Sequence, residues 1–128
     1  MPTVHRGITR TVVLTRRYAV KVPSLRGHAE GGLRGRLAGL AHGLLANQSE
    51  RQWSGYEPWV GLVAPVLWSW LGGVVQVYPR CEPLPVTCRH EYVGDESLPV
   101  LDPDPGDHKA DNYGLLDGRI VRIDYDLR

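Results

Sequence analysis

The sequence predicts an α+β fold, in which an antiparallel sheet of three hairpins is packed against one long helix. Short runs rich in β-branched and aromatic residues flank turn sequences within residues 9–23, 60–78 and 113–125. Between the first two of these regions, residues 31–53 place apolar side chains at helical spacing. With 128 residues, 42% of them hydrophobic and 23% charged, the chain supports one core, so we expect a single domain over residues 1–128.

The first hairpin is predicted at residues 9–23. Residues 11–14 and 18–22 are apolar, β-branched runs, and the polar residues 15–17 between them form the turn. Pro23 ends the second strand because proline cannot donate to a sheet ladder. A single lysine, Lys21, interrupts the apolar pattern of that strand.

The helix is predicted over residues 31–53. Its leucines share one face, at Leu33, Leu37, Leu40 and Leu44. Each glycine within a helix costs up to about 1 kcal/mol against alanine, so tertiary packing must hold this one. Glycines at 35, 39 and 43 form a stripe that would let another element approach closely.

The second hairpin is predicted from apolar runs at 60–64, 66–70 and 74–78, with Gly72 and Gly73 at the turn. Four tryptophans fall between residues 53 and 70, where they either fill the core or form a partner surface. The proline-rich, acidic stretch 83–106 is expected to be a loop with at most one helical turn near residues 89–92. The last hairpin is predicted at 113–116 and 119–125, around Asp117-Gly118.

Charge distribution and composition limit the classes of partner that the chain is expected to have. Basic residues dominate the first 39 positions and acidic residues dominate from Glu82 onward, which suits a phosphate and a metal held between the two halves. The basic half alone would also permit nucleic-acid binding, although no nucleic-acid-binding motif is present. The longest apolar stretch, residues 59–77, is broken by polar residues and glycines, so we expect no membrane span. The N-terminus lacks a signal pattern, which favours the cytoplasm.

Two further sites are weaker alternatives. Cys81 and Cys88 are expected to be free thiols, and a zinc site built from them and His90 would lack a nearby fourth ligand. The acids at 102, 104 and 107 resemble a calcium loop only loosely, because no glutamate closes it at the required spacing.

Three motifs resemble those of the protein-kinase-like superfamily, which includes aminoglycoside and other small-molecule kinases. Residues 107–112 follow the pattern D-x-K-x-x-N, and an aspartate lies between an apolar strand and an aromatic residue at 120–125. These are similar to the catalytic loop and the metal-binding hairpin. Residues 19–22, Ala-Val-Lys-Val, are similar to the strand that carries the phosphate-binding lysine. The resemblance implies a fold like the kinase N-lobe with the catalytic-loop hairpin appended.

The resemblance implies catalytic and metal-binding roles for the last hairpin and the loop before it. Asp107 would orient or deprotonate the acceptor hydroxyl, and Lys109 would steady the transferring phosphoryl group. Asn112 and Asp124 would hold Mg²⁺, a cation that proteins often bind through one or two carboxylates together with substrate phosphates.

The resemblance also implies an ATP site. Lys21 would contact the inner phosphates and would be oriented by a glutamate of the helix, for which Glu50 is the candidate. Glu30 is the rival, but it lies too near Lys21 in sequence for a strand-to-helix crossing. The segment that begins at Tyr78 resembles the hinge whose backbone meets the adenine ring.

The chain departs from the kinase pattern in ways that count against catalysis. No glycine-rich loop precedes Lys21, Pro105 replaces the usual histidine, and Asp124 is followed by Tyr125-Asp126 instead of aromatic-glycine. The favoured function is therefore a degenerate kinase-like module, or pseudokinase, that acts by protein–protein contact with weak ATP and Mg²⁺ binding. Minimal chains of this kind resemble small proteins encoded by bacteriophages and prophages, which implies that this chain acts on a host or phage protein. The alternative is an ATP-dependent phosphotransferase completed by a partner; no motif specifies an oligomeric state.

Overall fold

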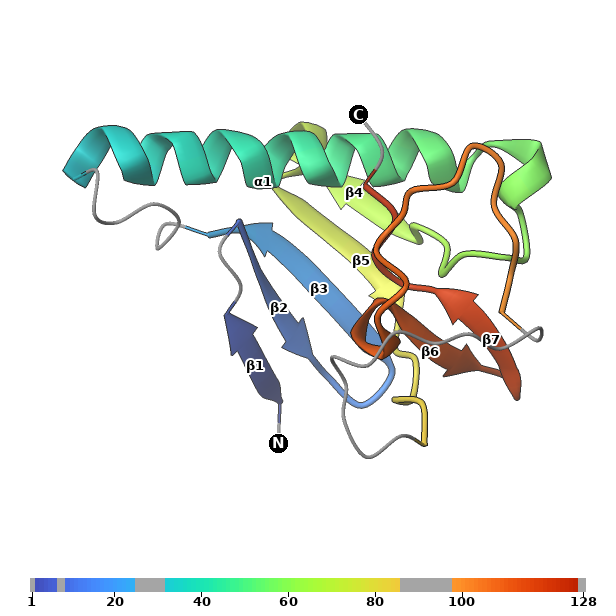
Figure 1. Cartoon of the computed structure of the whole chain (residues 1–128). Helices are drawn as coiled ribbons and strands as arrows, with labels where there is room; N and C mark the ends of the chain where they lie inside the picture. The colour runs from blue at the N-terminus through green and yellow to red at the C-terminus, as the bar shows by residue number, and fades with distance from the viewer. Residues whose placement is uncertain (1, 7–8, 25–31, 86–97, 127–128) are drawn as a thin grey trace.

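The computed structural model describes residues 2–6, 9–24, 32–85 and 98–126, and it has the predicted α+β class. A sheet lies beneath one long helix, and a separate hairpin packs beside it (Figure 1). The elements in chain order are β1 (Thr3–Arg6), β2 (Arg10–Leu14), β3 (Tyr18–Pro23), α1 (Gly32–Ser54), η2 (Glu57–Trp59), β4 (Trp68–Trp70), η3 (Leu71–Gly73), β5 (Val75–Pro79), η4 (Ala110–Asn112), β6 (Tyr113–Leu116) and β7 (Arg119–Arg122).

The main sheet has five antiparallel strands in the order β1-β2-β3-β5-β4. The β2–β3, β4–β5 and β6–β7 hairpins confirm three predicted turns. Three expectations were wrong. The last hairpin forms its own two-stranded sheet, and β1 is an additional edge strand. Residues 60–64 form a turn instead of a strand, with a single β-bridge from Val63 to Arg122 among the described residues.

The helix is where the sequence predicts it, but its leucine row is not its buried face. The glycine stripe, with Gly35, Gly39 and Gly43, is buried, and Gly43 contacts the start and end of the β2–β3 hairpin at Thr9 and Pro23, whereas Leu33 and Leu37 are exposed. The glycine face is the buried one because the backbone of a neighbouring segment approaches it too closely for a larger side chain. A Cβ at Gly43 would lie 2.1 Å from the carbonyl oxygen of Thr9, so only glycine allows this approach. The expectation that the stripe admits a close neighbour is thus confirmed.

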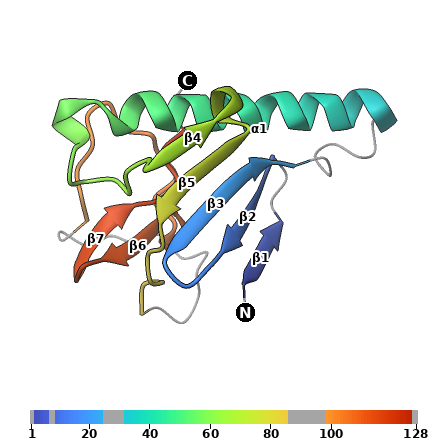
Figure 2. The ribbon, with the colours of Figure 1, turned by 180° about the vertical axis from the view of Figure 1, so that it is seen from behind.

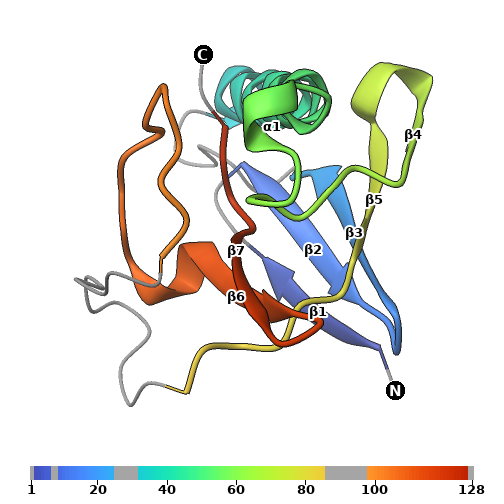
Figure 3. The same cartoon turned by 90° about the vertical axis from the view of Figure 1, so that its right-hand side faces the viewer.

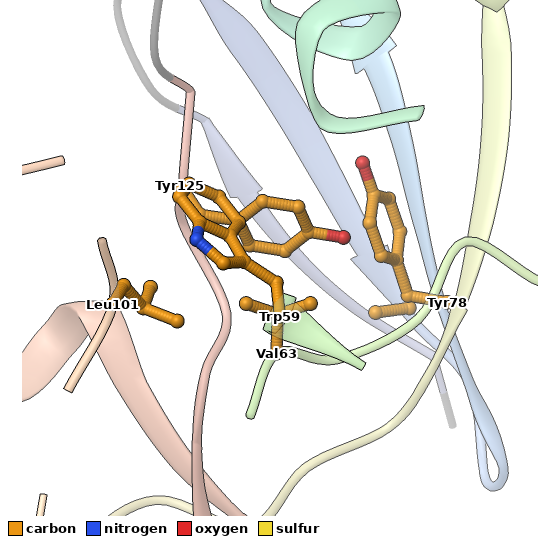
Figure 4. Close-up of a cluster of buried hydrophobic side chains, with 6 residues drawn as sticks. Trp59, Val63, Tyr78, Leu101 and Tyr125 are labelled. Carbon is orange, nitrogen blue, oxygen red and sulfur yellow. The ribbon is translucent and has the colours of Figure 1, made fainter. Parts of the chain in front are cut away.

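The hydrophobic core lies between the sheet, the end of α1 and the β6–β7 hairpin. Figure 4 shows Trp59, Val63 and Leu101 grouped around Tyr125, with Tyr78 reaching from β5 toward α1. Trp53 stacks on Trp59 with ring centroids 4.6 Å apart. The other two tryptophans, in β4, are exposed, so core filling accounts for only two of the four, and a partner surface at the other two stays a prediction.

The β6–β7 hairpin is attached by backbone hydrogen bonds on both of its strands. The backbone of Arg122 bonds to Leu62 and Ala64, at 2.9 and 2.8 Å, while Leu115 pairs with Glu82 in both directions. Gly114 permits this contact, because a Cβ there would lie 2.7 Å from the Cβ of Cys81. Viewed along α1, the hairpin lies to the left of β4 and β5 (Figure 3).

Two remaining expectations concern loops and membranes. The described parts of the 83–106 stretch contain no helix or regular strand, and residues 89–92 lie outside the described residues. No helix in the described ranges is long and apolar enough to cross a membrane.

Candidate functional site

The buried carboxylate of Glu50, on α1, is the centre of the candidate site. Glu50 is fully buried, and its Oε1 accepts hydrogen bonds from Lys21 Nζ at 3.0 Å and from the Tyr78 hydroxyl at 2.6 Å. Its Oε2 accepts the backbone N–H of Tyr125 at 2.9 Å. The guanidinium of Arg10 donates to both oxygens, at 2.6 and 3.3 Å. The strand-to-helix pair predicted between Lys21 and Glu50 is therefore present.

Lys21 is enclosed instead of facing solvent. It is 7% exposed, donates a second hydrogen bond to the Ile123 carbonyl at 2.7 Å, and lies 4.3 Å from the centroid of the Tyr78 ring. Burial lowers the pKa of the Lys21 ammonium, and the attraction of Glu50 offsets part of that effect. Lys21 thus connects the sheet, the helix and the segment after β7.

Arg10 is the charged member that sequence reasoning missed. Its Nη2 donates to Asp124 Oδ1 at 2.9 Å, and its Nη1 donates to Asn47 Oδ1 at 3.2 Å as well as to Glu50. One signal could have found it: Arg10 alternates in phase with Val12 and Leu14, which pack against the core. A charged residue in phase with core positions needs a buried partner.

The cluster balances its charges. Arg10 and Lys21 oppose Glu50 and Asp124, and only the Asp124 side chain, at 49% exposure, reaches solvent substantially. Burial alone would raise the pKa of the Glu50 carboxyl, but the charge of Arg10, followed by that of Lys21, holds that pKa far below its usual range. Burial, reinforced by Glu50, raises the pKa of Tyr78, so its hydroxyl keeps the proton that it donates.

Neutral polar groups fasten the cluster to the sheet. Asn47, one turn before Glu50, donates to the Gly73 carbonyl at 2.7 Å and to the Lys21 carbonyl at 3.2 Å. Gln76 of β5 donates to the Asn47 carbonyl at 2.6 Å and to the Tyr78 hydroxyl at 2.7 Å. These bonds join α1 to η3 and to strands β3 and β5, which fixes the position of Glu50.

The residues predicted to be catalytic lie on a loop next to this cluster. Asp107 and Lys109 form a partly exposed ion pair at 3.4 Å. The Asn112 amide donates to the Asp107 carbonyl at 2.7 Å, and the Asn112 carbonyl accepts the backbone N–H of Ile123 at 2.9 Å. Because the Ile123 carbonyl accepts from Lys21, one chain of contacts joins the loop to the cluster.

The seven predicted site residues therefore fall into two adjoining groups. Four belong to the buried cluster, namely Lys21, Glu50, Tyr78 and Asp124. Three belong to the loop, namely Asp107, Lys109 and Asn112.

Metal ligands are sparse in the described part of the chain. Among the residues described, no three His, Cys, Asp or Glu side chains gather closely enough to hold a metal ion. In the suggested calcium loop, the Asp104 carboxylate is engaged by the loop itself. It accepts the Gly106 N–H at 2.8 Å and lies 3.1 Å from the His108 ring. Asp124 and Asn112 offer oxygen ligands of the type that Mg²⁺ prefers, but Asp124 already faces a guanidinium.

The predicted hinge segment is extended, and part of its backbone is already paired. The N–H of Arg80 donates to the Arg17 carbonyl at 2.9 Å, and Glu82 pairs with Leu115 in both directions. The Tyr78 side chain points into the buried cluster and not toward solvent. Cys81 is a free thiol, as expected, whereas the other two proposed zinc ligands, Cys88 and His90, lie outside the described residues.

The basic half of the chain is spatially divided. Arg10 is used in the buried cluster. The exposed arginines at 16 and 17 lie in the β2–β3 turn, while those at 34 and 36 lie at the start of α1. These two places are at different ends of the molecule (Figure 1), an arrangement that does not favour one continuous nucleic-acid site.

Comparison of the chain with protein-family models, with curated protein sequences and with solved structures finds no match.

Proposed function

We propose that this chain is a degenerate kinase-like module that acts by contact with another protein and binds ATP and Mg²⁺ weakly. The observation that carries the proposal is the Lys21–Glu50 pair, at 3.0 Å, between the third strand and the helix. In kinases an ion pair of this kind positions the lysine on the phosphates of ATP. Asp124, the proposed metal ligand, lies in the same cluster through Arg10.

The same cluster supports weak binding. Nucleotide phosphates would have to reach a lysine that is already enclosed by Glu50, the Ile123 carbonyl and the Tyr78 ring. Mg²⁺ would have to compete with the Arg10 guanidinium, 2.9 Å from Asp124. An adenine ring would meet a hinge whose N–H groups at Arg80 and Glu82 are already bonded within the protein.

A thermal-shift titration with ATP, in Mg²⁺ and in EDTA, tests the proposal. With a dissociation constant near 1 mM, about 10 mM ATP stabilises the folded state by roughly 1.4 kcal/mol, or about 3–6 °C in a domain of this size. We expect that shift in Mg²⁺ only. Asp124→Asn should abolish it, whereas Asp117→Asn, the same change at the exposed hairpin turn, should retain it. A chain that shows no ATP-dependent shift, or an equal shift in both variants, contradicts the proposed site.

One observation favours the alternative of a phosphotransferase completed by a partner. Asp107 and Lys109 are partly exposed, as residues that meet an acceptor must be. ATP turnover by the purified chain, alone or with a candidate partner, separates the two functions. Turnover that Asp107→Asn abolishes, with the ATP-induced thermal shift unchanged, supports the enzyme; absence of turnover supports the degenerate module.

A further inference from the structure

The face of the main sheet that points away from α1 has an unusual polarity. On β3, Ala19 and Lys21 point toward α1, so Tyr18 and Val20 point to the opposite side. The antiparallel register extends this assignment across the sheet, since paired residues share a face. We call this opposite side the open face; it includes Val4, Val13, Val20, Val77, Trp68 and Trp70. Figure 2 shows the five strands with no described element in front of them.

The open face is apolar where a solvated face should be polar. An antiparallel sheet covered on one side normally places apolar residues under the cover and polar residues toward water. Here the covered side carries Lys21 and Gln76, while their strand neighbours on the open side are valines. The pattern is therefore that of a sheet covered on both sides.

The exposed area is largest on β4. Trp68 and Trp70 are 53% and 52% exposed, although each packs beside a valine of β5. At up to ~250 Å² per buried indole, these two side chains together leave roughly 250 Å² open. The tryptophans continue into the valines of β5 beside them. On soluble monomers the largest apolar patch is typically about 300–600 Å² and often has a binding role.

We propose that a second copy of this chain covers the open face, giving a symmetric dimer in which the two sheets pack face to face. Charge argues for self-association. Among the described residues whose side is set by the register, Arg6, on edge strand β1, is the charged one on this face. A two-fold interface brings the same patch of each copy together, so it tolerates an apolar face and would repel a charged one. A strongly charged partner would find no complement here.

The area of the open face is compatible with a dimer, and it sets the affinity that we expect for it. Five strands about 4.8 Å apart and about 17 Å long give a footprint of roughly 400 Å² on each copy. Two such faces bury about 800 Å² in total, which is less than the roughly 1,000 Å² of a stable specific interface and fits a weak, reversible one. We therefore expect a reversible dimer with a micromolar dissociation constant. This inference does not depend on nucleotide binding.

Sedimentation velocity of the complete chain from about 1 to 300 µM tests the inference. We expect the sedimentation coefficient to rise with concentration from monomer to dimer. Trp68→Lys with Trp70→Lys should weaken dimerisation by at least tenfold, because it places like charges on both copies. The matched control is Leu33→Lys with Leu37→Lys on α1, which changes two other exposed apolar side chains and should leave the dissociation constant unchanged.

Two results would overturn the inference. One is a wild-type chain that remains monomeric over the whole range, including the case in which the open face binds a different protein. The other is a dimer that the leucine variant dissociates and the tryptophan variant does not. Circular dichroism confirms that each variant is folded. Should the tryptophan variant unfold, Tyr18→Lys adds the same charge to a half-exposed position of the open face and must weaken the dimer.

Discussion

Replacing Glu50 with glutamine should remove a large part of the stability of this domain. The change keeps the shape of the side chain but deletes the negative charge shared by Arg10 and Lys21. Both cations remain nearly buried, with 10% and 9% of their side chains exposed, and Asp124 would be their remaining carboxylate in the cluster. The amide NH₂ would also face donors, because both carboxylate oxygens now accept hydrogen bonds.

The expected magnitude follows from the cost of leaving a buried charge uncompensated. Removing one partner of a buried ion pair costs about 3–5 kcal/mol. The whole free energy of unfolding of a domain this size is about 5–15 kcal/mol. With a urea m-value of about 1.5 kcal/mol/M, the urea midpoint of the variant should fall by roughly 2–3 M. Urea denaturation followed by circular dichroism measures it, and Glu57→Gln, at an exposed glutamate, is the matched control.

The loss of folding stability at acid pH independently tests whether the Glu50 carboxyl is ionised in the folded state. Its pKa is lowered in the folded state, so its stabilisation is fully present above the pKa of an unfolded glutamate, about 4.3, and is lost as the pH falls below it. Wild-type stability should therefore lose up to about 1.4 kcal/mol per pH unit below pH 4 from this group alone. The glutamine variant should lack that component of the slope. A variant within about 1 kcal/mol of wild type, with an unchanged acid slope, would refute the description of Glu50 as a buried ionised acceptor.

Three further substitutions test other contacts. Gly43→Ala should destabilise the fold by about 1–3 kcal/mol despite better helix propensity, because its Cβ would lie 2.1 Å from a backbone carbonyl; an equal or higher urea midpoint would contradict the packing. Tyr125→Phe should cost about 1–3 kcal/mol by leaving the Ala64 carbonyl without its 2.6 Å donor, and a thermal melt equal to wild type would argue against that bond. Burial raises the pKa of the Cys81 thiol to about 11, so little reactive thiolate is present at pH 8 in the folded chain. In a Cys88→Ser variant, a disulfide reagent at pH 8 should therefore react with Cys81 about 100-fold more slowly in the native than in the unfolded chain. Equal rates would contradict the burial of Cys81.

Local patterns predicted most of the elements, because each depends on residues close in sequence. The Asp-Gly turn at 117–118 and the glycine pair at 72–73 both occur between the expected strands. The short strand β1 was missed because its four residues, Thr-Val-His-Arg, show no apolar alternation. The separation of the last hairpin from the main sheet was also missed, since no local pattern states which edge a hairpin joins.

The orientation of α1 shows where hydrophobic periodicity misleads. Leucines at helical spacing normally mark the buried face. Here the sheet approaches so closely at Gly43 that no side chain fits between backbone and backbone, and the leucine row is displaced to one side. The glycine stripe was visible in the sequence, but the closeness of the approach is a property of the assembled fold.

The candidate site was partly predictable. Lys21 and Glu50 could be paired because a resemblance supplied both positions. Arg10 could not be identified in that way, because one arginine among many carries no distinguishing motif, and its role depends on the register of β2 against β3. The roles of Asp107 and Asn112 in phosphate chemistry stay predictions.

The hydrogen bond between Arg10 and Asp124 joins positions 114 apart in the chain. Protein synthesis runs from the N-terminus, so the helix and the first three strands exist while Asp124, the Ile123 carbonyl and the Tyr125 N–H are still missing. A nascent chain at that stage would hold two cations against one carboxylate and cannot complete its charge balance. Ribosome-bound intermediates of this domain should therefore be loosely folded, and their final consolidation should coincide with the arrival of the residues that follow β7.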